Sequence, residues 1–166
     1  MGGGGLKGLN LLREAVRESL GKAGIRAVAA YPGKARRYPG TVVTVDVGAV
    51  EGRPLALGSY LGCREEKGAL RELYGCRLDF SLRLEVRAES AGDCEEGWEA
   101  VCDALEGRLP AGIRLSRQSW EALAWDAGTE RFLRRGELGG SAYFTAERDA
   151  ETAALLDFTL KGVVGI

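Results

Sequence analysis

Residues 74–89 read YGCRLDFSLRLEVRAE, and this stretch decides the fold class. Its apolar residues alternate with polar ones, at Leu78, Phe80, Leu82, Leu84 and Val86. Successive side chains of a β-strand point to opposite faces of a sheet, so the alternation predicts a long strand with one buried face and one wet face. The rest of the chain supplies the neighbours that such a strand needs.

Two segments have helical periodicity. In residues 9–23 the apolar residues recur at helical spacing and predict an amphipathic helix. Residues 94–105 (CEEGWEAVCDAL) predict a second helix, with Asp93 as its N-cap and Glu96 completing a capping box. Its expected core face is centred on Trp98 and contains Cys94, Trp98, Val101, Cys102, Leu105 and Leu109.

Shorter β runs surround these segments, at residues 25–30, 41–47, 113–125, 131–146 and 155–164. Glycines at 136, 139 and 140 predict a bulge or break in one of them. Residues 58–73 are poorly patterned and predict either a long loop or a hairpin arm. We therefore expect an α+β fold with two helices packed on one face of a mainly antiparallel β-sheet. Residues 1–8 are expected to be a flexible Gly-rich leader, and residues 9–166 a single domain.

Composition argues against several classes of function. The formal net charge of −1 gives no global basic field for nucleic acid, and no apolar run is long enough to span a membrane. Histidine is absent, which removes the commonest zinc ligand and general base. The four cysteines show no CxxC spacing and are expected to be free thiols of a cytosolic protein. No nucleophile or phosphate-binding motif is present, so we expect no enzyme activity, no catalytic residue, no cofactor and no metal.

Charge is unevenly distributed along the chain. Up to Val50 there are eight Lys and Arg residues against three Asp and Glu residues, whereas residues 89–107 hold seven acidic residues and no basic one. On a helical wheel the acidic residues of the second helix gather on one flank, and Gly97, Ala100 and Ala104 gather on the opposite one. Such a flank either faces a basic partner or is simply solvated. The basic run at residues 33–38 either contacts phosphate groups or is a solvated loop.

Several stretches together resemble a known family. They are LREAVRESLGKAGI (12–25), LALGSYLG (55–62), ELYGCRLDFSLRLEVRAE (72–89), the Trp- and Cys-containing helix that follows, WDAGTERFLRRGELGGSAYF (125–144) and LLDFTLKG (155–162). Their order and residue patterns are similar to those of small tail proteins encoded by phages and prophages of Gram-positive bacteria. Among these proteins, the chain most resembles the tail-terminator, or tail-completion, group of long-tailed phages. The resemblance covers nearly the whole chain after the Gly-rich leader and includes no catalytic signature.

The resemblance implies a structural subunit that forms a ring, usually a hexamer, which caps the tail tube and offers a surface to the head. The implied partners are further copies of the chain, the tail tube protein and the head–tail connector, with DNA passing through the channel as a transient contact and no membrane. The implied location is the bacterial host cytoplasm during assembly, and then the virion tail. Two alternatives stay open: a head–tail connector or other minor tail component, and a small ligand-binding regulatory α+β domain.

A closed ring also suggests which residues meet between subunits. One surface of each subunit must contact a different surface of the next, and opposite charges give such an interface its orientation. We expect the acidic flank of the second helix to face a basic segment of the neighbouring subunit. The candidate interface residues are Glu95, Glu99, Asp103 and Glu106 on one side and Lys34, Arg36 and Arg37 on the other. The small flank opposite would allow close approach of a neighbour.

Overall fold

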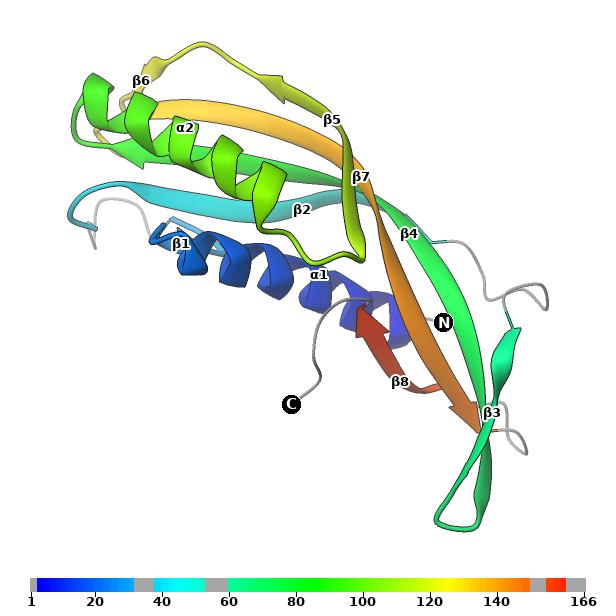
Figure 1. Cartoon of the computed structure of the whole chain (residues 1–166). Helices are drawn as coiled ribbons and strands as arrows, with labels where there is room; N and C mark the ends of the chain where they lie inside the picture. The colour runs from blue at the N-terminus through cyan, green and yellow to red at the C-terminus, as the bar shows by residue number, and fades with distance from the viewer. Residues whose placement is uncertain (1–2, 32–37, 53–59, 150–154, 161–166) are drawn as a thin grey trace.

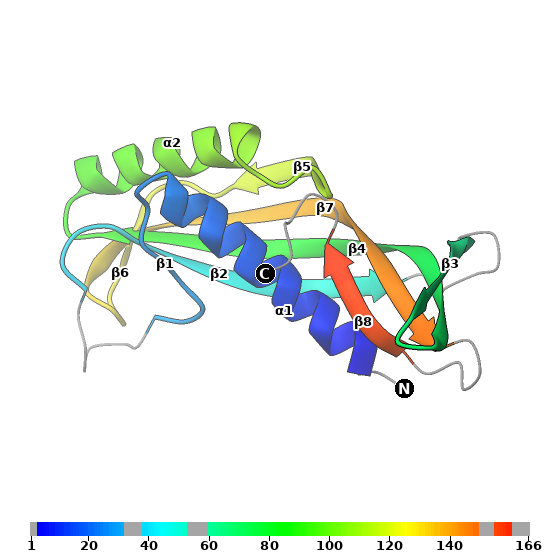
Figure 2. The same ribbon diagram turned by 60° about the horizontal axis from the view of Figure 1, so that its bottom comes forward.

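A computed structural model describes residues 3–31, 38–52, 60–149 and 155–160. In this part of the chain two helices pack on one face of a single eight-stranded sheet (Figures 1 and 2). Every strand pair is antiparallel except the short one between β1 and β2. The predicted α+β fold is therefore confirmed. The elements in chain order are α1 Gly3–Lys22, β1 Ala27–Val28, β2 Val42–Gly52, β3 Tyr60–Glu66, β4 Ala69–Ala88, α2 Ala91–Gly107, β5 Ile113–Trp120, β6 Ala124–Asp126, β7 Arg131–Asp149 and β8 Leu155–Leu160.

The predicted alternating strand is part of β4, whose antiparallel ladder with β7 forms the middle of the sheet. Pairing runs without a register shift from Arg71↔Asp149 to Ala88↔Phe132. Even-numbered β4 residues from Leu78 to Ala88 are buried under the helices, as the alternation predicts. We call this helix-covered side the inner face. The opposite side, which carries Arg83, Glu85 and Arg87, is called the outer face.

Helix α1 buries the predicted apolar stripe, with Leu12, Val16 and Leu20 fully inaccessible. It begins at Gly3, so residues 3–8 lie in a helix where we expected a flexible leader. Gly24, with φ of 83°, ends the helix in the left-handed conformation that glycine adopts readily. The Ile25 and Gly24 amides then donate to the Leu20 and Gly21 carbonyls, as in a Schellman motif.

Helix α2 begins three residues earlier than predicted. Its N-cap is Ser90, whose hydroxyl oxygen accepts a hydrogen bond from the Asp93 amide at 3.1 Å. The prediction of Asp93 as N-cap was therefore wrong, because Ser90 provides the same capping acceptor one turn upstream. Asp93 instead lies in the first turn, where a carboxylate opposes the positive end of the helix dipole.

Residues 60–73 form the hairpin arm that was one of the two expected alternatives. β3 pairs with the start of β4, and the turn between them has Lys67 and Gly68 at φ of 52° and 76°. Two consecutive positive φ values are typical of the tight turns that suit the twist of a hairpin. In Figure 1 this arm extends at the lower right, beyond the part of the sheet that the helices cover.

The glycines of β7 lie at a bulge, one of the two predicted alternatives, but the extra residue is in the partner strand β5. β7 is continuous, and the irregularity lies in β5, where Leu115 pairs with Gly140 and Arg117 with Gly139. A Cβ atom at Gly140 would lie 2.3 Å from the Arg114 carbonyl oxygen. The glycine therefore allows the bulged strand to approach closely.

Candidate functional site

The acidic flank of α2 was the first half of the expected interface. Glu99, Asp103 and Glu106 are exposed, and no ion pair joins them to another residue in the described part of the chain. Their negative charge and burial of the thiol raise the pKa of Cys102, with burial the larger cause. We call these three carboxylates the acidic flank from here on.

Glu95 differs from the other three because it has a basic partner within its own chain. Its Oε1 accepts a hydrogen bond from Arg134 Nη1 at 2.8 Å, and both side chains are partly buried. The Arg134 guanidinium also lies 3.8 Å from the centre of the Trp98 ring. Glu95 therefore holds α2 against β7, a role that the sequence analysis did not assign to it.

Arg134 was missed by the sequence analysis, although β-strand alternation contains the signal for it. Residues 134, 136 and 138 share one face of β7, and Leu138 is fully buried. An arginine on that face needs an acceptor, and Glu95 provides it. Pairing of residue 134 with Val86 places it beneath α2.

The flank of small residues packs inside the molecule instead of meeting a neighbour. A Cβ atom at Gly97 would lie 2.5 Å from Thr41 Cγ2 and 3.3 Å from Val86 Cγ1. Ala104 is 2% exposed, and only Ala100 is open to solvent. The expectation of close approach by another subunit on this flank was therefore wrong, since Gly97 and Ala104 face the sheet.

The basic half of the expected interface cannot be placed. Lys34, Arg36 and Arg37 lie outside the described residues. The nearest described neighbours of that segment include Tyr38, whose ring is 5.4 Å from the Arg26 guanidinium. The contact between these basic residues and the acidic flank stays a prediction.

Two large apolar side chains are exposed in the described residues, Leu70 on the hairpin arm and Trp125 on β6. Trp125 stacks edge-on against Phe132, with ring centres 5.1 Å apart. Leu70 is the second residue of β4, in the arm that extends in Figure 1 beyond the part of the sheet that the helices cover, and it is not part of the core cluster. Exposed apolar residues on an arm are candidates for contact with another chain.

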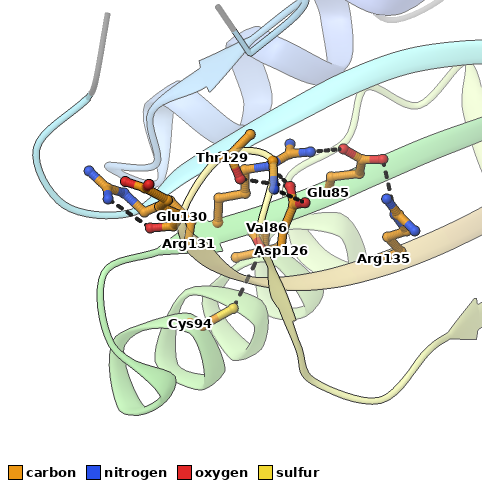
Figure 3. A network of polar contacts seen from close by, with 10 residues as sticks. Glu85, Val86, Cys94, Asp126, Thr129, Glu130, Arg131 and Arg135 are labelled. Atoms are coloured by element: carbon orange, nitrogen blue, oxygen red, sulfur yellow. Dashed lines mark hydrogen bonds and ion pairs between the residues drawn. The ribbon is translucent and has the colours of Figure 1, made fainter. Parts of the chain in front are cut away.

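The outer face of the sheet carries a network of ion pairs (Figure 3). Glu85 contacts Arg87 Nη2 at 2.6 Å and Arg135 Nε at 3.3 Å. Asp126 accepts hydrogen bonds from the Thr129 hydroxyl at 2.7 Å and the Gly128 amide at 3.1 Å, and lies 3.7 Å from Arg87 Nε. The Thr129 hydrogen bond is the main cause that lowers the pKa of Asp126, against a smaller opposing effect of burial.

No disulfide joins the cysteines whose side chains the structure describes. Cys63, Cys94 and Cys102 are free thiols, and the side chain of Cys76 lies outside what the structure describes. The Cys94 thiol donates to the Val86 carbonyl at 3.4 Å, and burial raises its pKa. A raised pKa keeps the thiol protonated, which is the less nucleophilic form.

No protein-family model matches the sequence, and no curated protein matches it significantly. Within the described residues, no group of three or more carboxylates or thiols is arranged to hold a metal ion. No helix there has the length and apolar character needed to cross a membrane.

Proposed function

We propose that this chain is a structural subunit of a phage or prophage tail, and that it acts as a tail terminator. Copies of it would form a ring, expected to be a hexamer, that caps the tail tube and meets the head–tail connector. The proposal rests on the resemblance of the sequence stretches to that family and on an α+β fold of the kind that the resemblance implies.

The observation that carries the proposal is the hairpin arm of β3 and the start of β4. The β4–β7 ladder continues past the region covered by α1 and α2, and the arm presents Leu70 at 49% exposure. Such an extension buries little of its own chain, so its stability gains most from contact with another subunit.

The acidic flank supports assembly in a second way. Three carboxylates lie on one side of α2 without an ion pair in the described residues, at the cost of mutual repulsion. A basic surface on the adjacent subunit would remove that repulsion and orient the contact. Lys34, Arg36 and Arg37 are the proposed basic residues.

Negative-stain electron microscopy of the purified chain tests the proposal. We expect closed rings of uniform diameter with a central channel, alone or at the ends of tubes polymerised from a tail tube protein. Particles of one or two subunits, both alone and in the presence of tubes, would count against a tail terminator. A ring that binds a head connector but not tubes would favour the connector alternative.

A further inference from the structure

The outer face of the sheet carries three exposed arginines on the part formed by β4, β7 and β5. Both helices pack on the inner face, so no helix of the described residues covers these arginines (Figures 1 and 2). They are Arg83 on β4 and Arg114 and Arg117 on β5, and we call them the arginine row. An antiparallel sheet can leave one face to solvent or to another chain, and charge is what a partner would recognise here.

The bulge in β5 brings two of these arginines to the same face. Residues three apart in a regular strand point to opposite faces. Arg114 pairs with Ser141 and Arg117 pairs with Gly139, so Ser116 is the extra residue and both arginines face outward. A Cβ atom at Gly139 would lie 3.5 Å from Nε and from Nη2 of Arg117, so the missing side chain leaves room for the guanidinium to lie over β7.

The arginine row has no carboxylate partner in its own chain. No ion pair joins Arg83, Arg114 or Arg117 to a carboxylate in the part of the chain that the structure describes. The other outward arginines of β4 and β7 each have one. Glu137, which pairs with Arg83 across the strands, is the acidic residue within the row. The row therefore keeps an excess of positive charge.

A hollow in the outer face makes the row accessible to side chains of a partner. Its volume is about 340 Å³, and Arg117, Ser119 and Glu137 line it. A carboxylate that enters it can accept charge-assisted hydrogen bonds from the Arg117 guanidinium. Glu137 on the wall opposes a second negative charge, so the arginines nearby must outnumber it, as the row does.

The acidic flank of α2 matches the arginine row in charge and in length. Glu99 and Glu106 are about 10 Å apart along the helix axis. Arg83 lies two strands away from β5, which is also about 10 Å. The flank belongs to a helix on the inner face and the row lies on the outer face, so the sheet separates them within one subunit. Only a second copy of the chain can bring them together, as in a heterologous interface.

We propose that the acidic flank of α2 of one subunit docks on the arginine row of the next. The contact covers the free face of the sheet with a helix of the neighbouring copy and gives the flank a basic surface that the structure describes. It rests on the proposed function in one respect, since copies of the chain must associate.

Three charge-reversed proteins provide the test. The row-reversed protein carries Arg83→Glu, Arg114→Glu and Arg117→Glu. The flank-reversed protein carries Glu99→Lys, Asp103→Lys and Glu106→Lys. The run-reversed protein carries Lys34→Glu, Arg36→Glu and Arg37→Glu. Thermal unfolding verifies that each is folded, and a neutral variant, Arg114→Gln with Arg117→Gln, tests the row without introducing repulsion.

Light scattering coupled to size-exclusion chromatography measures the mass of each particle. The row-reversed and flank-reversed proteins should shift towards monomer, and the neutral variant should raise the concentration of half-dissociation about two- to tenfold. One chain that carries both the row and flank reversals has the net charge of wild type and should recover the wild-type mass. A chain that carries the run and flank reversals has the same net charge and should not recover it.

Several results would overturn the proposal and leave self-assembly intact. The first is a wild-type mass for the row-reversed protein. The second is that the chain with row and flank reversals fails to recover the assembled mass of wild type. The third is that the chain with run and flank reversals recovers it equally well, since balanced charge alone would then be sufficient.

A wild-type protein that stays a single chain would contradict the proposed ring, and the contact is then tested by itself. ¹⁵N-labelled row-reversed protein is mixed with unlabelled flank-reversed protein, and the labels are then exchanged. Saturable amide shifts on α2 of the first protein and on β5 of the second would support the contact without a ring. Absence of shifts on either element would overturn it.

Discussion

At the scale of single residues, the lack of a side chain at Gly97 determines how closely α2 approaches the sheet. Thr41 and Val86 occupy the space where a Cβ atom would lie. Glycine costs about 1 kcal/mol of helix propensity relative to alanine, so its presence inside a helix is explained by this contact. From the sequence, Gly97 was expected to belong to an exposed flank of small residues on α2.

Gly97→Ala should lower the free energy of unfolding by about 1–3 kcal/mol, because overpacking outweighs the gain in helix propensity. Gly92→Ala is the matched control in the same helix, since a Cβ atom there has no heavy atom within 4 Å. It should leave stability unchanged or raise it slightly. Urea unfolding followed by circular dichroism measures both, and a stabilised Gly97→Ala protein would show that α2 does not pack as described.

Asp126 gives a pH dependence with a definite sign. Its pKa is lowered in the folded protein, chiefly by the Thr129 hydroxyl, so folding favours the charged carboxylate. The stability that it contributes is present above its unfolded pKa of about 3.9 and is lost as the pH falls through the lower folded value. Asp126→Asn should therefore lower the melting temperature at pH 6, and the difference from wild type should shrink at pH 3 and below. A difference that stays constant over this range would contradict the assigned pKa shift.

At the scale of elements, the sequence predicted the type and order of the main helices and strands, because their burial follows simple periodicities. The alternation in β4 identified its inner face correctly, since the residues under the helices are apolar and those on the other side are polar, although Arg87 on that other side is also buried. The hairpin of residues 60–73 stayed ambiguous, because most of its side chains face no core and so carry no alternation. Its turn depends on a positive φ at Lys67 as well as at Gly68. A lysine in the sequence does not indicate a positive φ, because lysine rarely adopts one.

The rotation of α2 was predicted less well than its existence. A helical wheel centred on Trp98 puts the largest apolar residue in the middle of the core face. In the structure, the buried residues of α2 are Cys94, Val101, Ala104 and Leu105, and Trp98 lies at the edge, half-buried. Contact with Arg134 and Trp120 explains the position, since a ring at the edge of the core can accept a cation over its face. Neither partner is close to Trp98 in sequence.

Trp98→Ala should destabilise the protein by about 2–3 kcal/mol, less than the 3–5 kcal/mol typical of a fully buried tryptophan. Trp125→Ala removes the same side chain from an exposed position and should cost about 1 kcal/mol or less. Equilibrium unfolding in guanidinium chloride compares them. Equal costs would mean that α2 is not anchored to β7 through Trp98 and Arg134.

At the scale of the whole molecule, two features of the described residues are candidates for contact between subunits: the projecting arm and the acidic flank. They lie on different elements, so each would contact a surface other than itself on the neighbouring subunit, as in a heterologous interface. Repeated contacts of this kind close into a ring when the rotation from one subunit to the next is a whole-number fraction of a full turn. The resemblance to tail terminators sets the expected number at six.

Reversal of the acidic flank tests its part in assembly. Glu99→Lys, Asp103→Lys and Glu106→Lys together should shift the protein towards monomer, although single rim pairs contribute only about 0–1 kcal/mol each. The control is Glu18→Lys, Glu51→Lys and Glu121→Lys, which makes the same change in net charge at exposed positions away from α2. Size-exclusion chromatography should separate the two variants. Equal elution at low protein concentration would show that the flank is only solvated.

The mass of the wild-type particle in solution tests the central claim of self-assembly most directly. Light scattering coupled to size-exclusion chromatography should give about six times the 17.7 kDa chain mass at low ionic strength. The mass should fall as salt is raised, because screening weakens charged contacts at the rim of an interface. A mass of one chain at every salt and protein concentration, with or without tail tubes, would contradict the account.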